Sequence, residues 1–446
     1  MTHAELHYKK MTETPVSVLI LKLGIPTTIS MLITSIYNMA DTYFVGTLGP
    51  SAQAATGVLF TLQSIIQGIA FMLGQGSGTF ISRELANKDT DTASMYVSSA
   101  FFFGGAIGVI ILCIGMVFLA PMVRFLGSTE TIVPYAMDYG FWVLVSCPLV
   151  ICSMILNNGL RFEGKAFYAM FGLTAGGLLN ILGDYLLVVQ FNMGVYGAGL
   201  ATATSQTVSF LILLYMFRKM AQSRIHIRYA SHDFRKYLII CKVGLPSLIR
   251  QSLNSVTTGV LNNLTKPFGD AAIAAMSVVS RYGMFMMCVG LGMGQGFQPV
   301  AAFNYQAKKY DRVKKGLIFI ICFGLVFVGS ICISSMIFSE SVISLFQKKE
   351  EVILIGAKAL RFTCCGMLFM PFSVPVNMLY QSIQKPTISS VLSMIRSGMI
   401  TIPLLIIGVP LFGLISIQTA QPIADVIAGL ISIPFIIHFL RTKDFH

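Results

Sequence analysis

The sequence predicts an all-α membrane protein with twelve transmembrane helices in two pseudo-symmetric six-helix lobes. Composition supports the membrane assignment, because 55% of the 446 residues are hydrophobic and only 11% are charged, and the mean hydropathy is +0.76. Soluble domains carry about 25% charged residues. A sequence repeat, described below, supports the two lobes.

Apolar segments of about 20 residues, each long enough to cross the hydrocarbon layer, recur along the whole chain. In the first half the predicted spans are 16–45, 52–82, 93–120, 131–158, 166–190 and 195–218. In the second half they are 237–265, 271–305, 316–338, 352–384, 387–410 and 413–440. The predicted domains are a first lobe at 1–220, a cytoplasmic linker at 221–236 and a second lobe at 237–446.

The two halves repeat each other at one constant spacing. The sequence KLGIP at 22–26 recurs as KVGLP at 242–246, and GQG at 74–76 recurs at 294–296. No gap is needed to align these motifs. A duplicated, strongly apolar chain is typical of pseudo-symmetric membrane transporters.

Lysine and arginine are concentrated in alternate connections between the spans, at 83–88, 161–165, 218–236 and 308–315. Because such loops stay on the cytoplasmic side, both termini are expected in the cytoplasm and the protein in the plasma membrane. The net charge of +13 then reflects topology and contacts with membrane lipids. We therefore expect no nucleic-acid partner.

Two acidic residues lie within the spans of the first lobe, where charges are costly and usually functional. Asp41 is late in the first span and Asp184 is in the fifth. Since both helices run outward, both acids are expected in the outer half of the membrane. Tyr37 and Asn180 precede them by one helical turn, on the same helix faces.

Three more polar side chains are expected at this depth: Tyr139 in the fourth span, and Thr202 and Gln206 in the sixth. Two carboxylates in a weakly solvated pocket cannot both stay ionised without a counterion. The pair is therefore predicted to hold a proton, or a Na⁺ surrounded by carboxylate, amide and hydroxyl oxygens. The alternative is two separate acids, each capped by neighbouring hydroxyls or amides.

The candidate ion site is not duplicated in the second lobe. When the repeat is aligned at its constant spacing, Leu261 takes the place of Asp41, and Leu404 takes the place of Asp184. The scaffold is therefore repeated, whereas the acids are not.

The second lobe has intramembrane charges of its own. Arg396 and Asp425 lie near mid-membrane in the last two spans and are expected to form a structural ion pair. Arg250 and Arg281 have no nearby acid in the sequence, so we expect them to face a water-filled cavity and to meet substrate or backbone carbonyls. The candidate residues of a substrate cavity are Arg250, Asn254, Arg281, Met287 and Asn377.

The chain resembles the multidrug and toxic compound extrusion (MATE) family over essentially its whole length. The resemblance rests on the twelve spans, on the duplicated Gly-Pro opening of each lobe, and on three motifs. These motifs are YNMAD at 37–41 followed by Gly46, NILGD at 180–184, and GAGLAT at 197–202.

The resemblance implies roles for single residues. Prokaryotic members use an aspartate on the first helix, an Asn-x-x-x-Asp pair and a threonine as a cation site in the amino-terminal lobe. The corresponding residues here are Asp41, Asn180, Asp184 and Thr202. Another branch keeps acidic residues on the seventh and tenth helices, where this chain has Asn254, Asn262 and Asn377.

The implied function is H⁺- or Na⁺-coupled antiport that exports amphipathic, mostly cationic drugs by alternating access. No cofactor is expected beyond the coupling ion, and the protein is expected to be a monomer in contact with membrane lipids. The nearest alternative is a flippase for a lipid-linked saccharide, which Arg250 and Arg281 keep open. An intramembrane enzyme is not expected, because no HExxH motif occurs. A channel is disfavoured by the two-lobe repeat.

Overall fold

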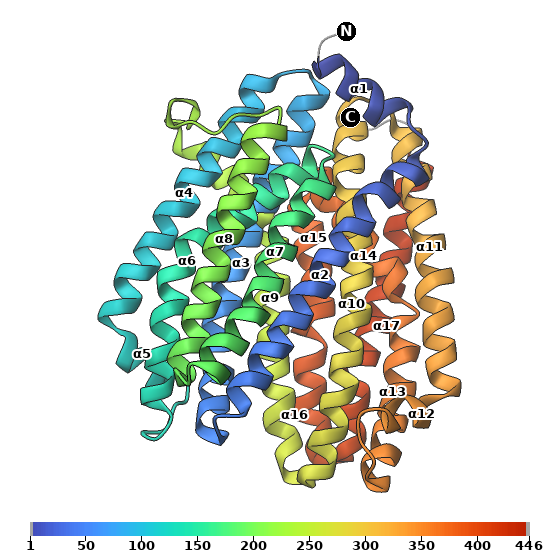
Figure 1. Cartoon of the computed structure of the whole chain (residues 1–446). Helices are drawn as coiled ribbons and strands as arrows, with labels where there is room; N and C mark the ends of the chain where they lie inside the picture. Colours follow the sequence, from blue (N-terminus) through green and yellow to red (C-terminus); the bar gives the residue numbers. More distant parts are fainter. Residues whose placement is uncertain (1–2, 443–446) are drawn as a thin grey trace. The chain divides into compact units, whose positions relative to one another are not determined.

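The structure is a computed structural model that describes residues 3–442, and these residues contain helices and no strands (Figure 1). The helices of the first half are α1 (His3–Glu13), α2 (Val16–Gly46), α3 (Pro50–Ala86), α4 (Thr90–Val117), α5 (Leu119–Phe125), α6 (Val133–Phe162), α7 (Ala166–Asp184), the π-helix η1 (Tyr185–Gln190) and α8 (Gly194–Met220). A short 3₁₀ turn, η2 (Ile227–Tyr229), lies between the halves.

The helices of the second half are α9 (Phe234–Thr265), the 3₁₀ turn η3 (Lys266–Phe268), α10 (Gly269–Gln306), α11 (Tyr310–Ile337), α12 (Ser339–Ser344), α13 (Glu350–Met367), α14 (Met370–Ser382), α15 (Pro386–Met394), the π-helix η4 (Ile395–Met399), α16 (Thr401–Phe412) and α17 (Leu414–Arg441).

The predicted fold class is confirmed for the described residues. Ten helical stretches are long and apolar enough to cross a membrane, and one of them, Phe234–Gln306, contains both α9 and α10. A further span is the pair α13 and α14, which bends by 46° at its break. Counting these separately gives the twelve spans that the sequence predicted.

Contacts between Cα atoms divide the chain into two compact units. Unit 1 contains residues 1–13 and 25–248, and unit 2 contains residues 14–24 and 249–446. Helices α2 and α9 are therefore each shared between the units. This division by contacts differs from the division of the sequence at 220 and 236, because the opening segment of each half joins the unit formed by the other half.

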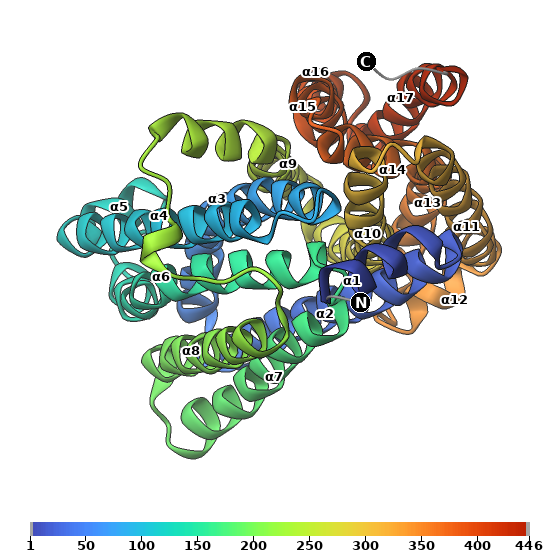
Figure 2. The same ribbon diagram turned by 90° about the horizontal axis from the view of Figure 1, so that it is seen from above.

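In each unit, long helices each pack against several neighbours. In unit 1, α6 packs against α3, α4 and α8, and α7 packs against α8 (Figures 1 and 2). In unit 2, α10 packs against α11, α13 and α14, while α17 packs against α13, α14 and α16 (Figure 2).

The repeated glycines of unit 1 lie where two helix backbones meet. A Cβ added at Gly244 of α9 would lie 1.8 Å from the carbonyl oxygen of Met72 of α3, and one added at Gly76 would lie 2.1 Å from the carbonyl oxygen of Ile240. Only glycine allows the two backbones to approach this closely, as in other small-residue crossings of membrane helices.

Unit 2 repeats this crossing with the other pair of motifs. A Cβ added at Gly296 of α10 would lie 2.4 Å from the backbone nitrogen and Cα of Gly24 of α2. The KxGxP and GQG motifs therefore recur in the sequence because each unit contains one contact between them.

Identical residues at the constant spacing of the repeat also share their local structure. Lys88 and Lys308 both adopt a left-handed conformation, with φ of 62° and 57°, at the turn that follows α3 and α10. Asn157 Nδ2 donates to the carbonyl of Ala169 (3.0 Å), and Asn377, its counterpart in the repeat, donates to the carbonyl of Ser389 (2.6 Å). Asn377 therefore joins two helices of the scaffold, a role that differs from the cavity role predicted for it.

The helix α1 was not among the predicted elements, and it packs on unit 1 through His7. The ring nitrogen Nε2 of His7 donates to the carbonyl oxygen of Glu163 (2.9 Å), at the end of α6. The buried carboxylate of Glu163 accepts from the backbone nitrogens of Gln222 (2.6 Å) and Ser223 (3.1 Å) and pairs with Lys165 (3.3 Å). One residue thus connects α1, the start of α7 and the segment after α8.

Candidate functional site

Asp41 lies buried near the carboxyl end of α2, in unit 1, and contacts Tyr139 of α6. Tyr139 Oη donates to Asp41 Oδ2 over 2.6 Å, and Gln63 Nε2 of α3 lies 3.5 Å from Tyr139 Oη. The other carboxylate oxygen, Asp41 Oδ1, is buried and has no donor among the described residues. Asp41 is therefore only half satisfied.

Asn180 and Asp184 lie one turn apart at the end of α7, and both are buried. Asn180 Nδ2 donates to Thr202 Oγ1 of α8 over 3.2 Å. Asn180 Oδ1 and both carboxylate oxygens of Asp184 are buried without a donor in the described part of the chain. The charge of Asp41 acts on the carboxyl of Asp184, although no hydrogen bond joins the two acids within the described residues.

Within residues 3–442, the site thus contains four buried oxygen acceptors without donors: Asp41 Oδ1, Asn180 Oδ1, Asp184 Oδ1 and Asp184 Oδ2. Buried polar atoms are nearly always hydrogen-bonded, so each exception calls for an explanation. A shared proton or a bound cation would satisfy these oxygens, because carboxylate, amide and hydroxyl oxygens are ligands for both.

A cavity of about 510 Å³ opens beside Asp41 within unit 1. Five of the predicted residues line it, and they are Tyr37, Asp41, Tyr139, Thr202 and Gln206. Gln206 Nε2 lies 3.4 Å from Tyr37 Oη. A second cavity of about 440 Å³ shares Tyr37 and Gln206 with the first and extends past Ser153 and Ser209.

The cavity also contains polar residues that the sequence reasoning did not select: Asn38, Gln63, Gln67 and Ser146. Gln63 and Gln67 are one turn apart on α3, in the middle of a predicted span. Two intramembrane glutamines at this spacing are a signal that could have identified the α3 face of the site.

Local backbone features position these side chains. A Cβ added at Gly177 of α7 would lie 3.0 Å from Cδ1 of Tyr37, so this glycine makes room for the tyrosine ring. The π-helix η1 begins at the residue after Asp184. Wide turns of this kind are frequent at functional sites, because they re-aim side chains and release backbone groups.

Arg396 and Asp425, in unit 2, form the predicted ion pair, and both are buried. Arg396 Nε lies 3.1 Å from Asp425 Oδ1, and Gln421 Nε2 lies 3.4 Å from the same oxygen. Arg396 Nη2 lies 3.1 Å from the sulfur of Met287. Met287, predicted to line a substrate cavity, is thus in contact with this pair.

The other predicted residues of unit 2 differ in their surroundings. Arg250 is half-buried, whereas Asn254 and Arg281 are exposed. None of these three side chains lines the two cavities of unit 1 or the cavity of unit 2 that is described next.

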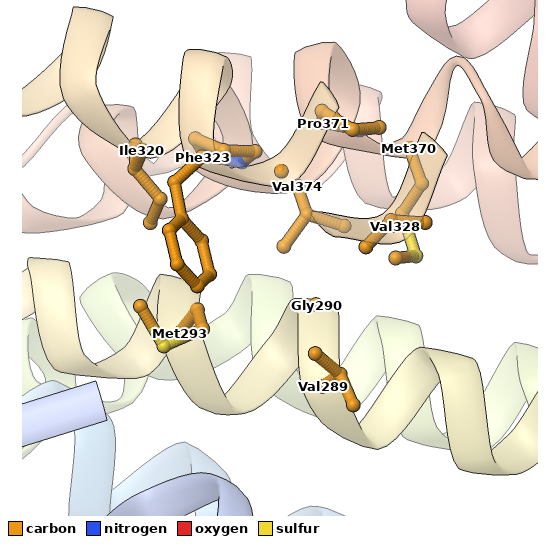
Figure 3. A pocket seen from close by; sticks show the side chains of 11 residues that line it. Val289, Gly290, Met293, Ile320, Phe323, Val328, Met370, Pro371 and Val374 are labelled. Atoms are coloured by element: carbon orange, nitrogen blue, oxygen red, sulfur yellow. The ribbon is translucent and has the colours of Figure 1, made fainter. Parts of the chain in front are cut away.

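This apolar cavity, of about 320 Å³, lies in unit 2 between α10, α11 and α14 (Figure 3). Its lining includes Met293, Phe323, Val328, Met370 and Val374, and it contains no charged side chain.

Among residues 3–442 no group of three His, Cys, Asp or Glu side chains could hold a metal ion. A Na⁺ at the Asp41 site would therefore need amide and hydroxyl ligands besides its two carboxylates.

Comparisons with known proteins agree with this architecture. The MatE family model matches residues 26–186 and 246–407. The chain is 27% identical over 454 aligned residues to the multidrug export protein MepA of Staphylococcus aureus strain NCTC 8325 / PS 47, covering 99% of this chain and 98% of that protein. It is 27% identical over 424 residues to MepA of Staphylococcus saprophyticus, covering 94% and 93%. A crystal structure of MATE in complex with MaL6 superposes with a TM-score of 0.91 at 24% identity, covering 99% of this chain and all of that one.

Proposed function

Because the chain belongs to the MatE family, as the match over residues 26–186 and 246–407 shows, we propose that it is a multidrug exporter coupled to inward flow of H⁺ or Na⁺. The substrates are amphipathic, mostly cationic compounds. The observation that carries the proposal is the set of four buried acceptor oxygens around Asp41 and Asp184 that lack donors among the described residues. Its relatives, the multidrug export proteins of two staphylococci, support the substrate class.

The coupling ion binds at Asp41, Asn180, Asp184 and Thr202. Proton binding places hydrogen on a carboxyl that faces other acceptors, and Na⁺ binding brings the same oxygens around one cation. Either event removes the repulsion between two neighbouring carboxylates.

Coupling requires the protein to alternate between two arrangements, one open to each side of the membrane. The ion drives export only if it binds one arrangement more tightly than the other, since equal affinity shifts no equilibrium.

The polar cavity beside Asp41 supplies hydroxyl and amide groups for a cationic compound. Before the coupling ion binds, the two acids repel anions and attract cations.

The protein acts as a monomer in the plasma membrane, with both termini in the cytoplasm and lipids as its surroundings. It uses no cofactor besides the coupling ion, is not an enzyme and binds no nucleic acid. The lysine and arginine bias of the loops supports this orientation.

The test measures efflux of a fluorescent organic cation from proteoliposomes in which pH and Na⁺ gradients are imposed separately. We expect uphill efflux under one of the two gradients, which a channel does not perform. D41N and D184N are expected to reduce this efflux at least tenfold, because each removes an ionisable ligand. D138N, which changes an exposed acid of α6, is the matched control and is expected to stay within twofold of wild type. Gradient-driven efflux by D41N at the wild-type rate would refute the assignment.

A flippase for a lipid-linked saccharide remains the second candidate, and the charge of Arg250 inside unit 2 favours it. This function predicts transfer of a labelled lipid-linked saccharide between leaflets without any imposed ion gradient. The same vesicles therefore distinguish the two candidates.

A further inference from the structure

Helix α9 carries a polar stripe through the membrane. Arg250, Asn254, Thr258 and Asn262 follow one another at intervals of one helical turn, which places them along one face of the helix. Asn254, Thr258 and Asn262 are exposed. A polar, exposed face on a spanning helix is unfavourable against hydrocarbon, so this stripe lies against water or a polar ligand.

Arg250 lies at the middle of α9 and has no hydrogen-bond or ion-pair partner among the described residues. Its Nη1 atom is buried and makes no hydrogen bond, and no ion pair involves this side chain within residues 3–442. An arginine remains charged at any physiological pH. A buried donor without a hydrogen bond is unfavourable, so a partner from outside the chain is expected at Nη1.

The buried acid of unit 2, Asp425, already has partners. Asp425 Oδ1 accepts from both Arg396 and Gln421, and the charge that acts on Arg250 is that of Arg396, which has the same sign. In the described interior of unit 2, the positive charges of Arg250 and Arg396 are thus accompanied by one buried negative charge, that of Asp425, which pairs with Arg396. One positive charge remains uncompensated.

The backbone next to Arg250 is fixed by a helix contact. Thr257 Oγ1 of α9 donates to the carbonyl oxygen of Ser397 in η4 over 2.7 Å. A Cβ added at Gly398 would lie 3.3 Å from Cβ of Leu253, which is three positions after Arg250. The part of α9 that follows Arg250 is thus packed against η4, and a fixed backbone favours specific binding of a planar anion by the guanidinium.

From these observations we propose that Arg250 binds the carboxylate of an amphipathic ligand, with Asn254 beside it on the polar stripe. This inference rests on the proposed export function and adds to it the residue that distinguishes substrates with a carboxylate from substrates without one. A guanidinium donates two parallel hydrogen bonds to a carboxylate, and an ester lacks the charge that makes these bonds strong.

The test compares two dyes that share one ring system: a zwitterionic rhodamine with a free carboxylate and its cationic ethyl ester. Binding is measured by fluorescence titration of the full-length protein in nanodiscs of phosphatidylcholine, which has no net charge. We expect R250Q to weaken binding of the carboxylate dye at least tenfold and to change binding of the ester less than twofold. R441Q, at the exposed arginine that ends α17, is expected to change neither.

A second variant keeps the proposal testable if R250Q unfolds. R250K retains the positive charge but loses the paired donors, so it is expected to bind the carboxylate dye with an affinity between those of wild type and R250Q. Equal losses for both dyes, or an unchanged carboxylate affinity in a folded R250 variant, would overturn the proposal. Gradient-driven efflux of the ester reports on the export function alone, so the two proposals fail separately.

Discussion

Tyr139 of α6 donates a hydrogen bond of 2.6 Å to Oδ2 of Asp41 of α2, and this bond joins two helices that are far apart in the sequence. It satisfies one oxygen of the carboxylate and leaves the other without a donor among the described residues. The tyrosine therefore orients the acid while keeping one oxygen available for an ion.

Replacing Tyr139 with phenylalanine should weaken both stability and coupling. The substitution leaves Asp41 Oδ2 buried without its donor, which costs about 1–3 kcal/mol. We expect a lower melting temperature in detergent and a several-fold loss of gradient-driven efflux. Y135F, at an exposed tyrosine one turn earlier on α6, should behave like wild type. Normal efflux by Y139F would show that the bond does not position Asp41.

The helix crossing in unit 1 predicts opposite effects for two glycines of the same helix. In Gly76→Ala the new methyl group would meet the Ile240 carbonyl at 2.1 Å, so the helices must separate, at a cost of about 1–3 kcal/mol or more. Gly57, also on α3, has no atom within 4 Å of its added Cβ. Gly57→Ala should stabilise the helix by up to about 1 kcal/mol. Thermal unfolding of both variants in one detergent measures the difference. Similar melting temperatures for the two variants would contradict the crossing geometry.

The contact of α1 should depend on pH through His7, which lies outside the membrane-spanning segments. Burial lowers the pKa of His7 below its ordinary value, and its hydrogen bond to the Glu163 carbonyl and the charge of Glu163 only partly oppose this effect. Since the docked state has the lower pKa, docking is fully stable above a pH of about 6.5 and weakens as the pH falls below it. After correction for the intrinsic pH dependence of exchange, the protection of residues 3–13 should therefore decrease as the pH is lowered from 7.5 to 5.5.

The control for this prediction is H7F, which fills the buried position without a titrating group. Its exchange, after correction for the intrinsic pH effect, should show no such transition. A transition of equal size in H7F would assign the pH dependence to another group.

Much of the fold follows from the sequence because lipid imposes long, continuous apolar helices. Segments such as 316–338 have no other stable structure in hydrocarbon. The helices α1 and α5 were missed for the same reason, since short or polar helices lack that constraint. The apolar pattern of residues 352–384 predicted one span in which Pro371 and Pro375 allow a bend, whereas the position and the 46° angle of the break between α13 and α14 depend on local backbone geometry and packing.

The candidate site was partly predictable because a buried acid is rare in a spanning helix. Asp41 and Asp184 were identified on this ground, and their neighbours on the same helix faces followed from the helical period. Gln63 and Gln67 were missed because an uncharged side chain gives a weaker signal. Which oxygens lack donors depends on side-chain geometry across four helices, and no sequence pattern specifies that.

The role of Asn377 shows a limit of the same reasoning. A lone polar residue in a span suggests a cavity, yet its amide bonds the Ser389 carbonyl as Asn157 bonds that of Ala169. The two asparagines occupy equivalent positions of the sequence repeat, and this equivalence was a signal of a structural role. A polar residue that repeats with the scaffold is better interpreted as part of the scaffold.

The exchange of opening segments between the units has a consequence for biosynthesis. Gly24 meets its partner backbone at Gly296, so more than half of the chain must be made after Gly24 before that contact can form. At ribosomal rates of about 5–20 residues per second, this delay is about 15–50 seconds. During that time the amino-terminal part of α2 lacks this partner, and its glycine surface is open to lipid or to a chaperone. Gly244, in contrast, finds Met72 already inserted when it emerges, so the two equivalent crossings form at different stages of synthesis.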